Sequence, residues 1–182
     1  MNADSTLATA DDYVSSLRGR NLNVYLLGER VDEPVDHPII RPSINAMAES
    51  YQLAEDDPDL ATAWSSISEQ QINRFLHVPE SSLDLVQKNK MQRRMGQLTG
   101  TCFQRCAGLD TLSVLFSITY DIDKQHGTSY HERFVSFLKK AQSHNLIVGA
   151  GMTDPKGDRS KRPSNQSDPD LFMHVTRRTK EG

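Results

Sequence analysis

Apolar residues at intervals of three or four positions, the spacing of one face of an α-helix, dominate the first part of this chain. They predict helices over residues 11–20 and from about residue 42 to residue 56. Pro58 suits the first turn of another short helix, which is expected to end near residue 66. Residues 23–31 are instead β-like and end in a turn at Gly28. The pattern therefore predicts a mainly helical fold with little strand.

The longest predicted helix follows Pro79, because no proline occurs between that residue and Pro155. Residues 81–84 are typical of a capping box at its start. Glycines at positions 96 and 100 weaken this helix and mark a kink or a close approach. Its expected buried stripe is Leu83, Val86, Met91, Met95, Leu98, Cys102, Cys106 and Leu109. The pattern thus places both cysteines on one helix face.

Two further helices are expected over residues 111–124 and 128–144. The inward side chains of the second are predicted to be Phe134, Phe137, Leu138 and Ala141. Residues 171–176 alternate like a β-strand, and one strand cannot close a sheet. We therefore expect them to be the first strand of a β-domain that the 182 residues do not complete.

These elements predict three regions. Residues 1–10 are a disordered tail, residues 11–145 form an N-terminal helical domain, and residues 146–182 hold a polar turn and the start of the truncated β-domain.

Charge is distributed unevenly along the chain, although the net charge is only −3. Residues 1–70 carry 13 acidic and 4 basic side chains, whereas residues 71–182 carry 11 and 17. The basic part is interpreted either as solvated helix faces or as an anion site for phosphates. No nucleic-acid motif and no membrane-spanning run is present, so neither partner is expected. The absence of a secretory signal favours a cytoplasmic location.

Cys102 and Cys106 are the only cysteines, and residues four apart on a helix lie one turn apart on the same face. Both sulfurs could then bind one soft metal or an iron–sulfur cluster, which needs about four ligands. The alternative is a pair of buried, inert cysteines. Zinc would need further ligands, and His126, His131 and His144 have no zinc-ligand spacing.

A polar turn at residues 153–159 has the composition of a phosphate site. Backbone N–H groups near Gly157 and the cations of Lys156 and Arg159 would offset phosphate charge. It is neither a Walker loop nor a dinucleotide fingerprint, and the alternative is an ordinary surface turn. His131 and Glu132 are interpreted as polar residues at a helix start, and His37 as a structural residue of a turn.

Taken together, several segments resemble the N-terminal part of the 4-hydroxybutyryl-CoA dehydratase/vinylacetyl-CoA Δ-isomerase family, within the wider flavin-dependent 4-hydroxyphenylacetate 3-hydroxylase family. These segments are residues 23–29, 37–46, 101–106, 119–123, 130–134 and 152–159. The resemblance covers nearly all of residues 11–182. The cysteine pair is its specific part, because the hydroxylases of the wider group lack such a pair.

The resemblance implies an acyl-CoA-dehydrogenase-like fold, FAD, and a [4Fe–4S] cluster held by three cysteines and one histidine. Cys102 and Cys106 match the first two cysteine ligands, and the remaining ligands and the catalytic acid–base residues have no counterpart here. The segment matched to the flavin contact supplies Met152, Thr153, Lys156, Gly157, Asp158 and Arg159. The family acts on acyl-CoA thioesters and assembles as a homotetramer.

The resemblance therefore predicts an N-terminal segment of such a dehydratase and isomerase, inactive alone, with a separate C-terminal chain as a conceivable partner. In this family, FAD and the cluster allow removal of a C3 proton that is too weakly acidic for a side-chain base. The alternatives are a segment of a flavin-dependent 4-hydroxyphenylacetate 3-monooxygenase-type hydroxylase and a non-catalytic remnant.

Overall fold

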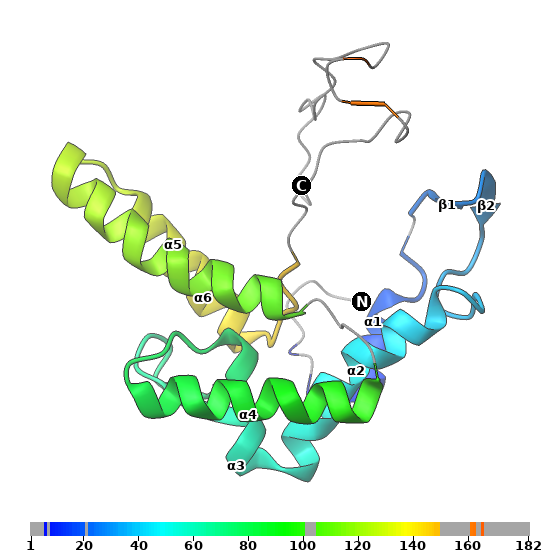
Figure 1. Cartoon of the computed structure of the whole chain (residues 1–182), viewed down its shortest axis with the longest axis horizontal. Helices are drawn as coiled ribbons and strands as arrows, with labels where there is room; N and C mark the ends of the chain where they lie inside the picture. Colours follow the sequence, from blue (N-terminus) through cyan, green and yellow to red (C-terminus); the bar gives the residue numbers. More distant parts are fainter. Residues whose placement is uncertain are drawn as a thin grey trace. The chain divides into compact units, whose positions relative to one another are not determined.

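The computed structural model of the chain describes residues 6, 8–20, 22–100, 105–149, 161–162 and 165 (Figure 1). It divides into two units, residues 1–149 and 150–182, and every helix and strand named below belongs to the first. The helices are α1 (Ala10–Leu17), α2 (Arg41–Asp56), α3 (Pro58–Ala61), α4 (Ser82–Thr99), α5 (Arg105–His126) and α6 (Tyr130–Ser143), with a 3₁₀ helix η1 (Arg74–Leu76). The strands are β1 (Val24–Leu26), β2 (Glu29–Val31), β3 (Thr62–Ser65) and β4 (Gln70–Asn73). The prediction of a mainly helical fold is confirmed. The strand predicted at residues 171–176 lies outside the described residues.

The N-terminal elements form where local signals place them. A reciprocal capping box between Thr9 and Asp12 starts α1. The β-like run is a hairpin rather than one strand, because Leu27 and Gly28 both have positive φ angles, 53° and 88°, and reverse the chain. Helix α2 begins with a proline in its first turn and ends at Asp56, as predicted.

Tyr51 connects α2 to distant parts of the helical unit. Its side chain is fully buried, and its hydroxyl donates a 2.8 Å hydrogen bond to the carbonyl of Asn145. Its ring stacks on that of Tyr13, with centroids 5.3 Å apart. Tyr51 therefore ties α1 and the segment after α6 to α2.

The helix predicted over residues 58–66 is wrong in its second half. Helix α3 is a single turn, capped by Asp57, and the Thr62 hydroxyl bonds back to the Pro58 carbonyl. Strand β3 follows and pairs antiparallel with β4. Ala63 and Ser65 are buried and Trp64 is exposed, which is the period-two pattern of a strand. The strand was missed because Pro58 suits the first turn of a helix and the alternation covers only four residues.

Ser81 caps the start of α4, because its hydroxyl accepts the amide N–H of Asp84. Its stripe is shorter than predicted: Met91 and Met95 are fully buried. The expected inward residues Leu83, Val86 and Leu98 are exposed. The helix ends where Gly100 adopts a left-handed conformation with φ 62°. The continuous helix expected through residue 109 is therefore wrong.

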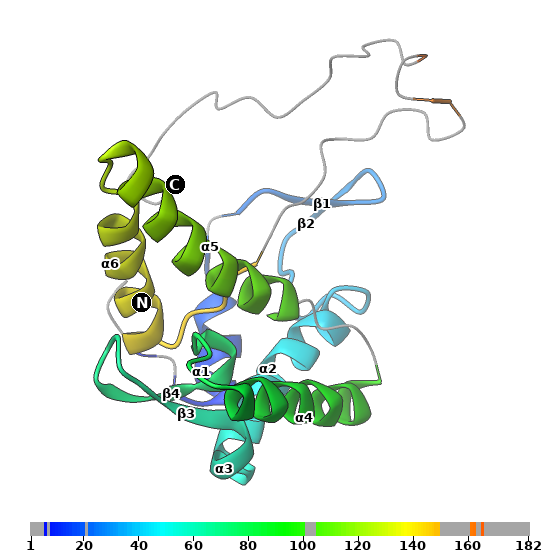
Figure 2. The ribbon, with the colours of Figure 1, turned by 60° about the vertical axis from the view of Figure 1, so that its left-hand side comes forward.

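Helices α5 and α6 lie side by side as an antiparallel pair (Figures 1 and 2). The turn between them depends on Gly127, which has a φ of 64°. Helix α5 begins at Arg105, six residues before the predicted start. Phe134, Leu138 and Ala141 are buried as predicted, but Phe137 is 47% exposed.

Two hydrophobic cores meet at η1. Its central residue Phe75 packs in a core with α2, α3 and α4. The next residue, Leu76, packs in a second core with β4, α5 and α6. Gln142 on α6 is buried but satisfied, because its amide accepts from the Ser65 hydroxyl and donates to the Leu76 carbonyl. Because Phe75 and Leu76 belong to different cores, η1 connects the core that contains α4 with the core that contains α5.

Candidate functional site

The cysteine-bearing segment lies where α4 gives way to α5. Cys106 is the second residue of α5, and Cys102 lies in residues 101–104, outside the described part of the chain. Helical spacing brings the two cysteines onto one face only if a single helix carries both, and the left-handed Gly100 ends α4 before them. The structure describes the backbone of Cys106 but the position of neither sulfur atom, so shared metal binding stays a prediction.

The predicted flavin contacts fall in the second unit. Met152, Thr153, Lys156, Gly157, Asp158 and Arg159 all lie outside the described residues. Within the described part of the chain, no three His, Cys, Asp or Glu side chains gather as metal ligands. Nor is any helix there both long and apolar enough to cross a bilayer.

A buried polar cluster surrounds the first turns of α4. Arg74, His77 and Lys88 are all at least 93% buried, and the Asp84 carboxylate lies among them. The Arg74 guanidinium donates to the carbonyls of Leu60, at 2.7 Å, and Asp59. Arg74 therefore satisfies the C-terminal end of α3.

His77 and Asp84 form the titratable centre of this cluster. The imidazole Nε2 is 3.6 Å from a carboxylate oxygen of Asp84. Burial lowers the pKa of His77, and the nearby carboxylate offsets part of that effect. Burial raises the pKa of Asp84, but hydrogen bonds from Ser81 and Glu80 outweigh this effect and hold the pKa below its ordinary value. The pair therefore favours an ionised carboxylate beside a neutral imidazole at pH 7.

Lys88 is the most unusual member of the cluster. Its side chain is 3% exposed, and its ammonium nitrogen Nζ has no hydrogen-bond partner among the described residues. Burial lowers the pKa of Lys88 from 10.5 to about 8, against the attraction of Asp110 and Asp84. Lys88 is one of the 17 basic side chains of residues 71–182, for which solvated helix faces or an anion site were expected, and its burial was not predicted. Its spacing of three and seven residues from Met91 and Met95 was the signal that it lies on the apolar stripe.

An open pocket of about 610 Å³ adjoins this cluster. Arg74, His77 and Asp84 line it, together with Trp64, whose side chain is exposed. Carboxylates of Asp59 and Glu80 also line the pocket. It combines an aromatic surface with an excess of negative charge.

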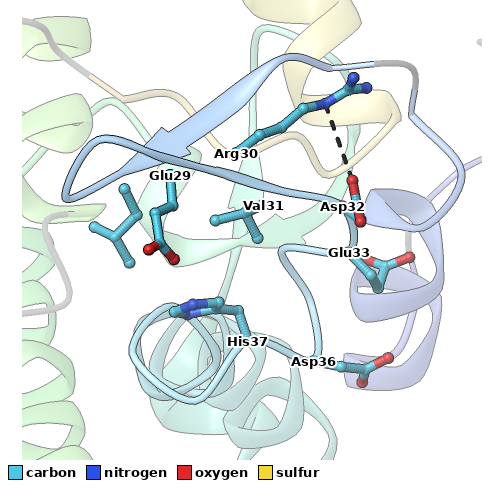
Figure 3. A pocket seen from close by; sticks show the side chains of 8 residues that line it. Glu29, Arg30, Val31, Asp32, Glu33, Asp36 and His37 are labelled. Atoms are coloured by element: carbon cyan, nitrogen blue, oxygen red, sulfur yellow. Dashed lines mark ion pairs between the residues drawn. The ribbon is translucent and has the colours of Figure 1, made fainter.

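A second pocket, of about 400 Å³, lies beside the β1–β2 hairpin (Figure 3). Glu29 and His37 point toward one another across it. Asp36, which also lines it, is held by two hydrogen bonds from Arg18 of 2.6 and 2.8 Å. His37 Nδ1 accepts the amide N–H of Ile39, so this histidine has a structural role in its turn.

His131 lies at the start of α6, as expected, and is also part of a network of side chains. The Thr119 hydroxyl donates its hydrogen to the Leu115 carbonyl, so at the 3.1 Å contact His131 Nδ1 must be the donor. The imidazole packs edge-on against Phe116 and Tyr120, at centroid distances of 4.9 and 5.5 Å. These contacts orient the ring between α5 and α6.

Asp123 caps α6 from the neighbouring helix. The cap residue Ser129 makes no side-chain bond, whereas the Asp123 carboxylate accepts from the Thr128 hydroxyl and from the amide N–H groups of Tyr130 and His131. Desolvation raises the pKa of Asp123, but these hydrogen bonds outweigh this effect and lower the pKa below its ordinary value. The cap therefore stabilises the fold above the ordinary carboxyl pKa and weakens as pH falls through the lower folded value.

Substitution Asp123→Ala should remove the cap of α6 and make local opening of its first turn more frequent. We expect the amide protons of Tyr130 and His131 to exchange about tenfold faster, as measured by hydrogen exchange. Asp121→Asn, on the same helix, is the matched control and should leave them unchanged. Equal exchange rates in both variants would refute the capping role.

Comparison with known proteins agrees with this helical architecture. The family model described as "4-hydroxyphenylacetate 3-hydroxylase N terminal" matches residues 9–182. The chain therefore belongs to the 4-hydroxyphenylacetate 3-hydroxylase family and corresponds to its N-terminal region.

Within that family, the chain is similar to dehydratases. It is 49% identical over 178 residues to 4-hydroxybutyryl-CoA dehydratase/vinylacetyl-CoA-Δ-isomerase of Clostridium aminobutyricum, covering 97% of this chain and 36% of that protein. The structure of an oxygen-tolerant archaeal 4-hydroxybutyryl-CoA dehydratase from N. maritimus matches with a TM-score of 0.84 and 59% identity, covering 96% of this chain and 35% of that one. The resemblance inferred from the motifs is confirmed. The chain spans about a third of the length of these relatives.

Hydroxylases of the family are more distant. An oxygenase component of 4-hydroxyphenylacetate 3-monooxygenase, complexed with FAD and 4-hydroxyphenylacetate, matches with a TM-score of 0.62 and 18% identity, covering 94% of this chain and 36% of that one. At that identity the match shows a shared fold and nothing more.

Proposed function

We propose that this chain is the N-terminal segment of a cytoplasmic, FAD- and iron–sulfur-dependent 4-hydroxybutyryl-CoA dehydratase/vinylacetyl-CoA Δ-isomerase. The observation that carries the proposal is the identity of 49% to such an enzyme, against 21% to a 4-hydroxyphenylacetate monooxygenase over a similar length. The fold expected for the whole protein is acyl-CoA-dehydrogenase-like, with an acyl-CoA thioester as substrate.

The cysteine pair gives this proposal its chemistry. Thiolates are the ligands that iron–sulfur clusters prefer, so Cys102 and Cys106 fit such a cluster in kind. They supply two of the roughly four ligands that a cluster needs. When bound, the cluster would serve as a Lewis acid toward the departing hydroxyl, and FAD would supply redox chemistry. We therefore infer that the remaining ligands and the acid–base residues come from outside this segment.

The turn around Gly157 is proposed to hold the flavin. Lys156 and Arg159 would offset the phosphate charge of FAD, and backbone N–H groups near Gly157 would donate to its oxygens. Met152, Thr153 and Asp158 complete the proposed contact. We infer that assembly with the rest of the enzyme completes the site. The rest is either part of the same chain, in a homotetramer, or a separate C-terminal chain.

The proposal requires both thiolates to reach one metal ion, and Cd²⁺ is a suitable soft probe. We expect the 182-residue chain to bind Cd²⁺ through both thiolates, with an ultraviolet charge-transfer band. Cys102→Ser and Cys106→Ser should each weaken binding about tenfold or more, because each removes one arm of a chelate. Thr101→Ser is the control and should bind as the wild type does. Unchanged affinity in either cysteine variant would contradict a shared site.

Activity separates the proposal from its alternative. After anaerobic reconstitution with iron, sulfide and FAD, we expect the chain alone to show no dehydration of 4-hydroxybutyryl-CoA. Turnover together with about four irons per chain would overturn the inference of an incomplete site. Oxygen-dependent hydroxylation of a phenol by the assembled enzyme would instead favour the hydroxylase alternative, which the cysteine pair opposes.

A further inference from the structure

Helix α4 has an outward face whose two halves differ in chemistry. Met91 and Met95 mark its inward side, which packs in the core with α2 and α3. Five exposed residues recur at intervals of three or four on the other side and therefore share one face: Leu83, Val86, Lys90, Arg94 and Gln97. The first half of this face is apolar, with Leu83 63% and Val86 47% exposed. The second half is basic.

The basic half carries three cations that no carboxylate accompanies. Lys90 lies three and four positions before Arg93 and Arg94, and like charges at these spacings destabilise a helix. All three side chains are exposed and form no ion pair within the described part of the chain. An anionic surface outside this face would offset their repulsion.

The apolar half of the face borders the open pocket of about 610 Å³. Leu83 lines this pocket beside Trp64, whose side chain is 61% exposed. The exposed side chains of Asp59 and Glu80 also line it, whereas the guanidinium of Arg74 is buried and donates to two backbone carbonyls. An exposed indole beside carboxylates suits a guanidinium, because the stem of an arginine packs on apolar surface while its planar head stacks on the ring.

Arg94 cannot enter this pocket in its own chain. Positions 83 and 94 are about 16 Å apart along the axis of α4, farther than an arginine side chain extends. In a second copy placed antiparallel, position 94 of one helix faces position 83 of the other, and position 86 faces position 90. Each pairing then occurs twice, as in the self-complementary interface of a twofold dimer.

We propose that a second copy of this chain docks antiparallel along α4, with Arg94 of each copy in the Trp64 pocket of the other. The charge complementarity between the basic half of the face and the carboxylates of the pocket selects this partner. The stems of Arg94 and Lys90 would cover Leu83 and Val86 of the opposite copy. The inference does not rest on the proposed function, because it involves neither the cysteines nor the predicted flavin contacts.

Charge reversal tests the pairing. We expect the 182-residue chain to form dimers in sedimentation velocity experiments between about 1 and 200 µM. Arg94→Glu and Glu80→Arg should each weaken dimerisation about tenfold or more, and the double variant should dimerise severalfold more tightly than either single variant. Lys139→Glu, which reverses an exposed charge on α6, is the control and should leave the dissociation constant unchanged. A chain that stays monomeric throughout, or a double variant no tighter than the single variants, would overturn the proposal.

Trp64 is the only tryptophan of the chain, so its fluorescence reports on the pocket directly. We expect its emission to move to shorter wavelength and its quenching by acrylamide to weaken as the wild type dimerises. Arg94→Glu should keep the emission of the monomer at the same concentrations. A dimer with unchanged Trp64 emission would place the interface elsewhere and refute the docking. Inorganic phosphate that binds a monomeric wild type but not Arg94→Glu would assign the cations to an anion instead, and would equally refute it.

Discussion

Substitution Lys88→Met should raise the free energy of unfolding by about 2–3 kcal/mol at pH 7. The amine is 3% exposed, and burial lowers its pKa from 10.5 to about 8 despite two nearby carboxylates. Desolvation therefore exceeds attraction at this site, and a methionine of similar length removes the penalty while keeping the packing. Urea denaturation of the two proteins gives the difference.

The pH dependence of the stability difference between the wild type and Lys88→Met is the most specific test of this prediction. Because the folded pKa lies below the unfolded one, the unfolded chain binds more protons between pH 8 and about 10.5, and wild-type stability rises with pH across that interval. The advantage of Lys88→Met should therefore be constant below pH 8 and should shrink between pH 8 and 10.5. Lys90→Met, an exposed lysine on the same helix, should change stability by less than about 0.5 kcal/mol at every pH. A destabilised Lys88→Met would show that attraction outweighs burial.

The second large effect concerns two neighbours on α6. Substitution Leu138→Ala should destabilise the fold by about 3 kcal/mol, because it removes a fully buried side chain from the core shared with η1 and α5. Substitution Phe137→Ala should cost less than about 1 kcal/mol, although it removes a larger side chain, because Phe137 is 47% exposed.

Chemical denaturation of both α6 variants measures this contrast directly. Similar losses of unfolding free energy in the two variants would mean that the Phe137 side chain is buried against another surface in solution. Such a result would assign the exposed side of α6 to an interface between chains, which this single chain does not contain. The cooperative m-value should stay unchanged in both variants if they act on the folded state alone.

Leu138 and Lys88 should change stability in opposite directions. Loss of the Leu138 side chain removes apolar packing from the core that holds α5 and should lower the free energy of unfolding. Replacement of Lys88 by methionine removes a desolvation penalty and should raise the free energy of unfolding.

Much of the fold follows from local signals in the sequence. Helices α1, α2 and α6 were predicted within a few residues, because each carries its own apolar stripe and a start or stop signal close by. The family resemblance also followed from short motifs, including the cysteine pair. These signals act within one or two helical turns, so they are independent of the remaining fold.

The errors arose where a short pattern fits two structures. Residues 62–65 alternate for only four positions, and pairing with β4 makes them a strand instead of a continuation of α3. Leu83, Val86 and Leu98 have helical spacing with Met91 and Met95, yet the structure covers only the methionines. Which part of an apolar stripe is buried depends on the neighbours that pack against it.

The sequence by itself determined that the chain is mainly helical, where most helices lie, and to which family it belongs, because capping, spacing and motif signals are local. Only the tertiary structure decided that α4 ends before the cysteines, that η1 joins two cores, and that Lys88 is buried. Burial and electrostatic environment arise from residues far apart in the chain, so they exist only once those residues have packed together.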